Sequence, residues 1–158
     1  LGPLINPARA TNQLIGVYSK AWTKPLAQVL HNLGSKHILV VHGADGLDEV
    51  TTTDKTFVVE IVNGSLQEYE ITPEDFGFKR AKPDDLLGGS IQENVEIARD
   101  VLAGGRGAHQ DIVLFNAGCA IYASDKTDTI DAGIKLAEKS INSGSALHKL
   151  ELLKEYSQ

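Results

Sequence analysis

Three carboxylates, Asp45, Asp48 and Glu49, follow closely on a short apolar run at residues 38–41. Carboxylate oxygens are the protein ligands that Mg²⁺ uses, and this ion is usually held by one or two carboxylates together with substrate phosphates. The residue types and their spacing therefore indicate a site for magnesium and a phosphorylated substrate. A surface turn is the ordinary alternative, since Asp-Gly is a common turn dipeptide and acidic residues often cap helices.

The apolar run must form a strand if these carboxylates are to lie at a site. Its sequence, Ile-Leu-Val-Val, is typical of a strand buried on both faces of a parallel sheet. In open α/β sheets, ligands bind beyond the carboxyl ends of the strands. The acidic residues come directly after such an end, so the predicted fold would place them where sites occur in this class.

The segments on both sides of this strand predict the elements that flank it. A helix is expected from Thr23 to Leu33, closed by Gly34 in a left-handed conformation. Residues 56–62 and 65–71 are β-prone runs joined by Asn-Gly, which favours a tight hairpin because both of its residues adopt positive φ. We therefore expect an antiparallel hairpin appended to the parallel sheet.

The second half of the chain predicts helices. Ser90 and Glu93 form a capping box, and a stripe of apolar residues with helical spacing follows it: Ile91, Val95, Ala98 and Leu102. Residues 111–124 are too long and apolar for a typical strand and predict a buried helix, in which Gly118 permits close packing. Thr127 is expected to cap the next helix, whose apolar face is Ile130, Ile134, Ala137 and Ile141.

Composition restricts the class of protein. The 158 residues suffice for one domain with a substantial core, and the formal net charge of -6 argues against general affinity for nucleic acid. No stretch of sequence approaches the apolar length that spans a bilayer. The single cysteine, Cys119, is expected to be a small core residue, and its lack of a disulfide partner indicates a reducing, cytoplasmic setting.

The chain contains no methionine and begins at Leu1. Because translation starts with methionine, we expect these residues to be the carboxyl-terminal portion of a longer polypeptide.

An ordered set of short motifs extends along the whole chain, and in it the chain resembles the carboxyl half of the tryptophan-pathway members of the nucleoside phosphorylase-like phosphoribosyltransferase family. The motifs are Leu1-Gly2-Pro3-Leu4, Asn6-Pro7, Gln13, Gly16-Val17, Val41-His42-Gly43, Asp45-Gly46-Leu47-Asp48-Glu49, Pro73-Glu74-Asp75-Phe76-Gly77, Gly88-Gly89, Asn94, Leu102-Ala103-Gly104, Asn116-Ala117 and Ser143-Gly144-Ser145-Ala146.

The resemblance implies a fold and a reaction. The fold is α/β: a mostly parallel sheet flanked by helices with an added antiparallel hairpin, which is the large domain of this family, incomplete at its amino end. Residues 1–158 would be the carboxyl-terminal part of that catalytic domain. The amino-terminal helical domain and the glycine-rich pyrophosphate loop would precede Leu1. The family transfers the phosphoribosyl group of phosphoribosyl pyrophosphate to anthranilate and releases pyrophosphate.

The resemblance also implies residue roles and partners. Asp48 and Glu49 match the acidic pair that holds Mg²⁺, while Gly2 and Pro3 match the Gly-Pro that lines the anthranilate side; no residue is implied as a covalent nucleophile. The intact polypeptide is expected to be a homodimer that binds phosphoribosyl pyrophosphate and anthranilate. The present chain alone is expected to be inactive, because it lacks the pyrophosphate loop.

Three other interpretations remain open at this stage. A family relative could have turned to nucleic-acid binding, although the acidic composition and the retained Asp48-Glu49 pair disfavour it. A pyrimidine nucleoside phosphorylase would share the fold but fits the motifs at 1–7 and 45–49 less well. The chain could also be a non-catalytic interaction or regulatory fragment.

Overall fold

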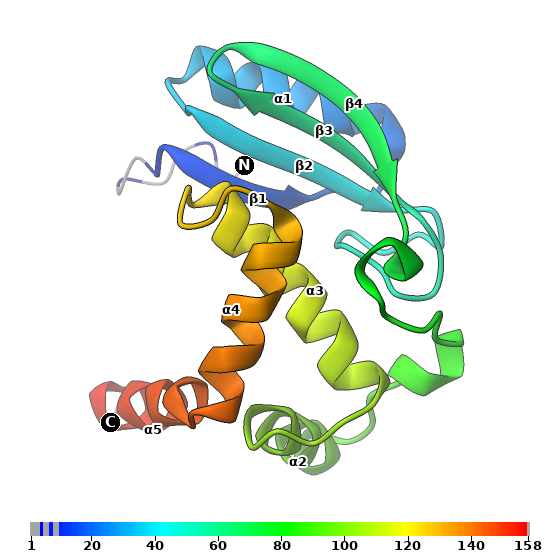
Figure 1. Ribbon diagram of the computed structural model, residues 1–158, viewed down its shortest axis with the longest axis vertical. Coiled ribbons are helices and arrows are strands. Elements are labelled where there is room, and N and C mark those ends of the chain that lie inside the picture. Colours follow the sequence, from blue (N-terminus) through cyan, green and yellow to red (C-terminus); the bar gives the residue numbers. More distant parts are fainter. Residues whose placement is uncertain (1–3, 5–6, 8–9, 158) are drawn as a thin grey trace.

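The computed structural model describes residues 4, 7 and 10–157, which form a small sheet with helices on both of its faces (Figure 1). Within these residues, no helix combines the length and the apolar character that crossing a membrane requires. The elements in chain order are β1 (Asn12–Gly16), η2 (Lys20–Trp22), α1 (Thr23–Asn32), β2 (His37–Gly43), β3 (Thr56–Val62), β4 (Ser65–Ile71), η3 (Pro73–Phe76), η4 (Pro83–Leu86), α2 (Ile91–Leu102), α3 (Ala108–Ala123), α4 (Ile130–Asn142) and α5 (Ser145–Tyr156).

The sheet has the strand order β1-β2-β3-β4. β1 and β2 are parallel, whereas β2 with β3 and β3 with β4 are antiparallel. The predicted hairpin is confirmed at both strands, and its turn residues Asn63 and Gly64 have φ of 51° and 78°. The α/β class is thus confirmed, and among the described residues the parallel part of the sheet consists of β1 and β2.

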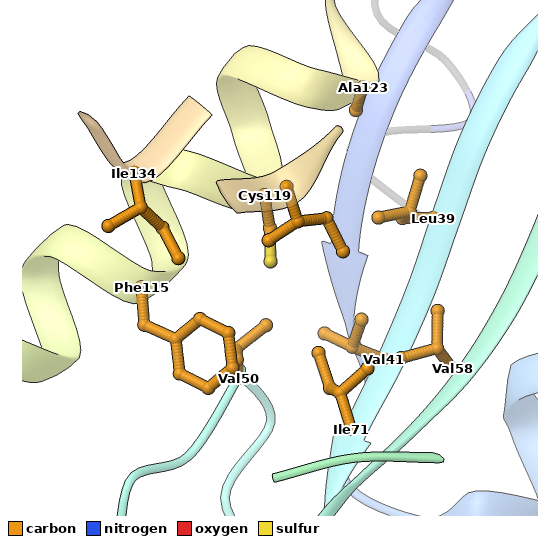
Figure 2. Packing of buried hydrophobic residues seen from close by; sticks show 10 residues of the cluster. Leu39, Val41, Val50, Val58, Ile71, Phe115, Cys119, Ala123 and Ile134 are labelled. Carbon is orange, nitrogen blue, oxygen red and sulfur yellow. The ribbon is translucent and has the colours of Figure 1, made fainter. Parts of the chain in front are cut away.

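β2 is buried on both faces, as its sequence predicts. Ile38 and Val40 contribute to one apolar cluster, which α1 completes with Ala27 and Leu30. Leu39 and Val41 alternate with them and point to the opposite face. There they pack in a second cluster with Val50, Val58, Ile71, Phe115, Cys119, Ala123, Ile130 and Ile134 (Figure 2).

α3 and α4 cross closely at two glycines. A Cβ on Gly118 would lie 2.3 Å from Ile134 Cγ1 and 2.8 Å from its backbone nitrogen, and a Cβ on Gly133 would lie 2.3 Å from the carbonyl oxygen of Gly118. This confirms the predicted role of Gly118. The neighbouring Cys119 is fully buried, and burial with the nearby charge of Glu60 raises the pKa of its thiol to about 12, so it is a core residue.

One detail of the predicted helices is wrong. α4 is capped by Thr129, whose hydroxyl accepts from the Ala132 amide at 3.1 Å, whereas the Thr127 hydroxyl donates to the Thr129 carbonyl. α2 begins with the predicted capping box, and its apolar stripe lies largely at the surface, since Ile91 is 86% exposed and Val101 is the residue of α2 that is buried. The predicted face of α4 is buried as expected.

A buried polar cluster joins the sheet to the end of α3, away from the acidic loop. His37 on β2 places Nε2 2.9 Å from Glu60 Oε1 and Nδ1 2.6 Å from Asp125 Oδ1. Glu60 also accepts from the hydroxyls of Tyr69 at 2.9 Å and Tyr122 at 2.7 Å. Burial, together with hydrogen bonding to Glu60 and its charge, raises the pKa of Tyr122 to about 12.

Candidate functional site

The acidic residues lie in a connection between β2 and β3, at the carboxyl end of the parallel strands. The end of β1 packs against this connection. A Cβ on Gly16 would lie 1.4 Å from the carbonyl oxygen of Asp48, so only glycine allows the two backbones to approach each other this closely. The following residue, Val17, donates its amide to the Val41 carbonyl at 2.9 Å, and its own carbonyl lies 2.8 Å from His42 Nδ1. The strand ends and the acidic loop therefore form one packed unit.

Asp45 shapes this loop from within. Its Oδ1 accepts from the Leu47 amide at 3.1 Å, and its Oδ2 accepts from the hydroxyls of Thr51, at 2.5 Å, and Thr53. Partial burial acts to raise the pKa of Asp45, but these three hydrogen bonds outweigh it and lower the pKa below its ordinary value. Both oxygens of Asp45 are thus occupied by the loop itself.

All three carboxylates are exposed, but Asp48 and Glu49 differ from Asp45 because, among the described residues, their side chains have no hydrogen-bond or ion-pair partner. Partial burial raises the pKa of Glu49, and the charges of Asp48 and Asp45 raise it further. Three carboxylates thus repel one another in a short segment, and a bound cation would relieve this repulsion. The structure separates the predicted trio into one carboxylate that shapes the loop and two that are available to a ligand.

Asn116 on α3 holds the far end of the loop. Its Oδ1 accepts from the Val50 amide at 3.0 Å, and its Nδ2 donates to the Val50 carbonyl at 2.7 Å and to the Ile112 carbonyl at 3.0 Å. Val50 is fully buried, so these bonds satisfy backbone groups that water does not reach. The side chain of Thr56 fixes the next residue, since its hydroxyl accepts from the Thr51 amide at 3.0 Å.

Sequence reasoning did not assign these supporting roles. The signal available for Gly16 and Asn116 was their place among the motifs of the family resemblance. Their function depends on contacts between segments far apart in the chain. The side chains of Thr51 and Thr53 carried no signal of their own. Gly2 and Pro3, the predicted anthranilate-side residues, lie outside the described residues.

The available carboxylates fit Mg²⁺ better than a metal ion that is coordinated by protein side chains on all sides. Within residues 10–157, no group of three or more His, Cys, Asp or Glu side chains converges to hold a metal. Two adjacent carboxylates on a rigid loop are the usual protein contribution to a magnesium site, where waters and substrate phosphates complete the coordination. Among the described residues, Asp48 and Glu49 are therefore a carboxylate pair that could hold such an ion.

The described residues thus form an α/β domain with an acidic loop at the ends of its parallel strands. A sequence model described as "Glycosyl transferase family, a/b domain" matches residues 1–147, and the chain belongs to this family.

Individual relatives are more specific. Anthranilate phosphoribosyltransferase from Rubrobacter xylanophilus is 52% identical over 152 residues, which are 96% of this chain and 44% of the relative. The crystal structure of anthranilate phosphoribosyltransferase from Thermus thermophilus has a TM-score of 0.85 and 41% identity over 95% of this chain and 44% of its own. The enzyme from Saccharomyces cerevisiae in complex with PRPP and Mg has a TM-score of 0.84 and 32% identity, over 96% of this chain and 44% of its own.

These comparisons confirm the resemblance and the fold class that the sequence predicts. The chain spans less than half the length of each of these relatives.

Proposed function

We propose that this chain is the carboxyl-terminal part of the catalytic domain of an anthranilate phosphoribosyltransferase. The enzyme would transfer the phosphoribosyl group of phosphoribosyl pyrophosphate to the amino nitrogen of anthranilate in tryptophan biosynthesis. The observation that carries the proposal is the pair of available carboxylates, Asp48 and Glu49, on a rigid loop at the strand ends. The fold that presents them is shared with a relative solved in complex with PRPP and Mg.

The chemistry of the transfer explains why such a pair is useful. The bond between ribose C1 and the pyrophosphate oxygen breaks, the amine nitrogen of anthranilate bonds to C1, and the amine then loses a proton. Negative charge develops on the departing pyrophosphate. A bound Mg²⁺ would supply a Lewis acid that neutralises this charge. The amine already carries its lone pair, so the protein needs no covalent nucleophile.

The residues of this chain contribute position and charge. Asp48 and Glu49 would hold the cation beside the substrate phosphates. Asp45, Gly16 and Asn116 hold the backbone on which these two carboxylates stand, so that the loop need not become ordered when substrate binds. Preorganisation of this kind lowers the entropy cost of bringing the reactants together.

Other parts of the site belong to this proposal as well. Gly2 and Pro3 would line the anthranilate side, and the amino-terminal part of a longer polypeptide would supply the groups that grip the pyrophosphate. The present chain alone would then be inactive. The intact enzyme would act as a homodimer in the cytoplasm. The relatives' greater length supports the presence of a further amino-terminal part, since the matched region is 44% of the Rubrobacter protein.

Loss of anthranilate fluorescence, on addition of phosphoribosyl pyrophosphate and magnesium, tests the reaction directly. The full product of the gene and the 158-residue chain should be assayed side by side. We expect turnover by the full product only. If the full product leaves anthranilate unconsumed, the proposed function is wrong. Turnover by the purified 158-residue chain would show that the reaction does not need pyrophosphate-binding groups from another part of the polypeptide.

A further inference from the structure

α2 carries an apolar stripe, most of which no described element covers. At about 100° per residue, Ile91, Val95, Ala98 and Leu102 lie within a narrow arc on one side of the helix. Leu102 is half-buried, and the other three residues form the exposed part of the stripe. Ile91 is 86% exposed and Val95 42% exposed, and Ala98 is also exposed. The stripe is therefore a surface of the chain as the structure describes it.

α2 packs against the rest of the described chain through a different side from the one that carries the stripe. Val101 is its buried residue and Ile97 is partly buried, and both lie roughly 100° around the helix from the stripe. The main contacts of α2 are with α3 and α5, at the end of the molecule away from the sheet (Figure 1). α2 is thus apolar on two sides, of which α3 and α5 cover only one.

The helix is well specified although it buries little. The Ser90 hydroxyl accepts from the Glu93 amide at 3.3 Å, and Glu93 Oε2 accepts from the Ser90 amide at 2.6 Å. Such a capping box defines the helix start. A helix with a defined start and an apolar stripe normally buries that stripe, because amphipathic helices gain most of their stability from packing. The neighbouring α5 buries none of its residues and exposes Leu153 and Tyr156. The two helices at this end of the molecule therefore leave apolar side chains uncovered.

The relatives indicate what covers these side chains. In the Thermus thermophilus structure the same fold, over 95% of this chain, is only 44% of the polypeptide. More than half of that protein therefore lies outside the part that this chain matches, and α2 is inside the matched family region at residues 1–147. We propose that the exposed part of the α2 stripe, Ile91, Val95 and Ala98, is an intramolecular docking surface for the amino-terminal part of the longer polypeptide. This inference rests on the proposed function only in assuming that longer polypeptide.

Single introduced cysteines test the surface without using activity. The native Cys119 is fully buried and its thiol has a pKa raised to about 12, so it gives little background reaction with a thiol reagent. Val95→Cys reports on the stripe. Glu96→Cys is the matched control, because the next residue is exposed on the same helix but points roughly 100° away.

Thiol labelling rates are compared between the 158-residue chain and the full gene product. In the chain alone both cysteines should react at similar rates. In the full product Val95→Cys should react at least about tenfold more slowly, since only local opening would expose it, while Glu96→Cys should change little. Equal labelling of Val95→Cys in both forms would overturn the proposal. Protection in the chain alone that grows with its concentration would also overturn it, because a second copy would then be the occupant.

The outcome is separate from that of the enzymatic proposal. Protection of Val95→Cys in a full product that does not consume anthranilate would retain the docking surface and reject the function. Consumption of anthranilate by a full product in which Val95→Cys is not protected would retain the proposed function and reject the docking surface.

Discussion

Substitution of Asn116 by alanine should destabilise the chain and loosen the acidic loop. Asn116 satisfies both backbone groups of Val50, the amide at 3.0 Å and the carbonyl at 2.7 Å, and Val50 is fully buried. A buried backbone group left unsatisfied costs about 1–3 kcal/mol, so losing both partners should lower the free energy of unfolding by roughly 2–4 kcal/mol.

A matched control exists elsewhere in the chain. Asn94 on α2 makes the same pair of bonds to Gly89, accepting from its amide at 3.0 Å and donating to its carbonyl at 3.2 Å. Both asparagines lie in helices, so alanine changes helix propensity equally at the two sites. Asn94 and Gly89 are exposed, however, and water can replace the lost bonds. Asn94→Ala should therefore cost less than about 1 kcal/mol.

Urea unfolding of the chain and the two variants, followed by circular dichroism, measures both values. The midpoint should fall clearly for Asn116→Ala and hardly move for Asn94→Ala, with unchanged slopes. Equal losses in the two variants would refute the reasoning, because burial of Val50 would then not decide the cost.

Three further predictions follow from the buried cluster, the strand end and the loop. Glu60→Gln removes the buried carboxylate that His37, Tyr69 and Tyr122 contact and should lower the free energy of unfolding by about 3–5 kcal/mol. Glu68→Gln on the next strand, whose ion pair with Lys24 is at the surface, should change this free energy by less than about 0.5 kcal/mol in the same urea experiment. Gly16→Ala places a Cβ against the Asp48 carbonyl and should cost roughly 1–3 kcal/mol by overpacking, with altered amide shifts throughout the acidic loop in NMR spectra. The pKa of Glu49 is raised above its ordinary value of 4.5, so the folded chain favours the protonated form. Glu49→Gln should therefore stabilise the metal-free chain near neutral pH relative to the native sequence, and this advantage should disappear as the pH falls below the raised pKa; an advantage that grows towards acid pH would contradict the assignment.

Local sequence signals were sufficient for several elements. The Asn63-Gly64 turn and its two flanking runs define the hairpin, because the positive φ at both turn residues is a property of those residues themselves. The run at 38–41 identifies β2, because a strand buried on both faces needs apolar residues at successive positions. The acidic loop could likewise be placed at the strand end from its position alone.

Other features depend on contacts that a single segment does not show. Asn116 and Val50 meet across two elements, and nothing in either segment indicates the pairing. Thr127 and Thr129 are both residues that can cap a helix, and Thr129 is the cap because α4 begins at Ile130. The apolar stripe on α2 was predicted from its helical spacing, but such a pattern shows that a face is apolar and not which partner covers it.

The division of the three acidic residues shows the same limit. Their spacing alone makes Asp45, Asp48 and Glu49 equally good candidates for metal ligands, since all three follow the strand closely. The structure distinguishes them, because Leu47, Thr51 and Thr53 occupy the Asp45 carboxylate. This distinction leaves a specific and testable pair for the metal.

The magnesium dependence of the full gene product tests the central claim most directly. Anthranilate consumption should be titrated with Mg²⁺ in the native enzyme, in Asp48→Asn/Glu49→Gln, and in Asp84→Asn/Asp85→Asn, an adjacent acidic pair on η4. We predict that the first double variant needs a much higher magnesium concentration and turns over slowly with its circular dichroism unchanged, while the second behaves as the native enzyme does. An unaltered magnesium titration in Asp48→Asn/Glu49→Gln would contradict the assignment of these two carboxylates.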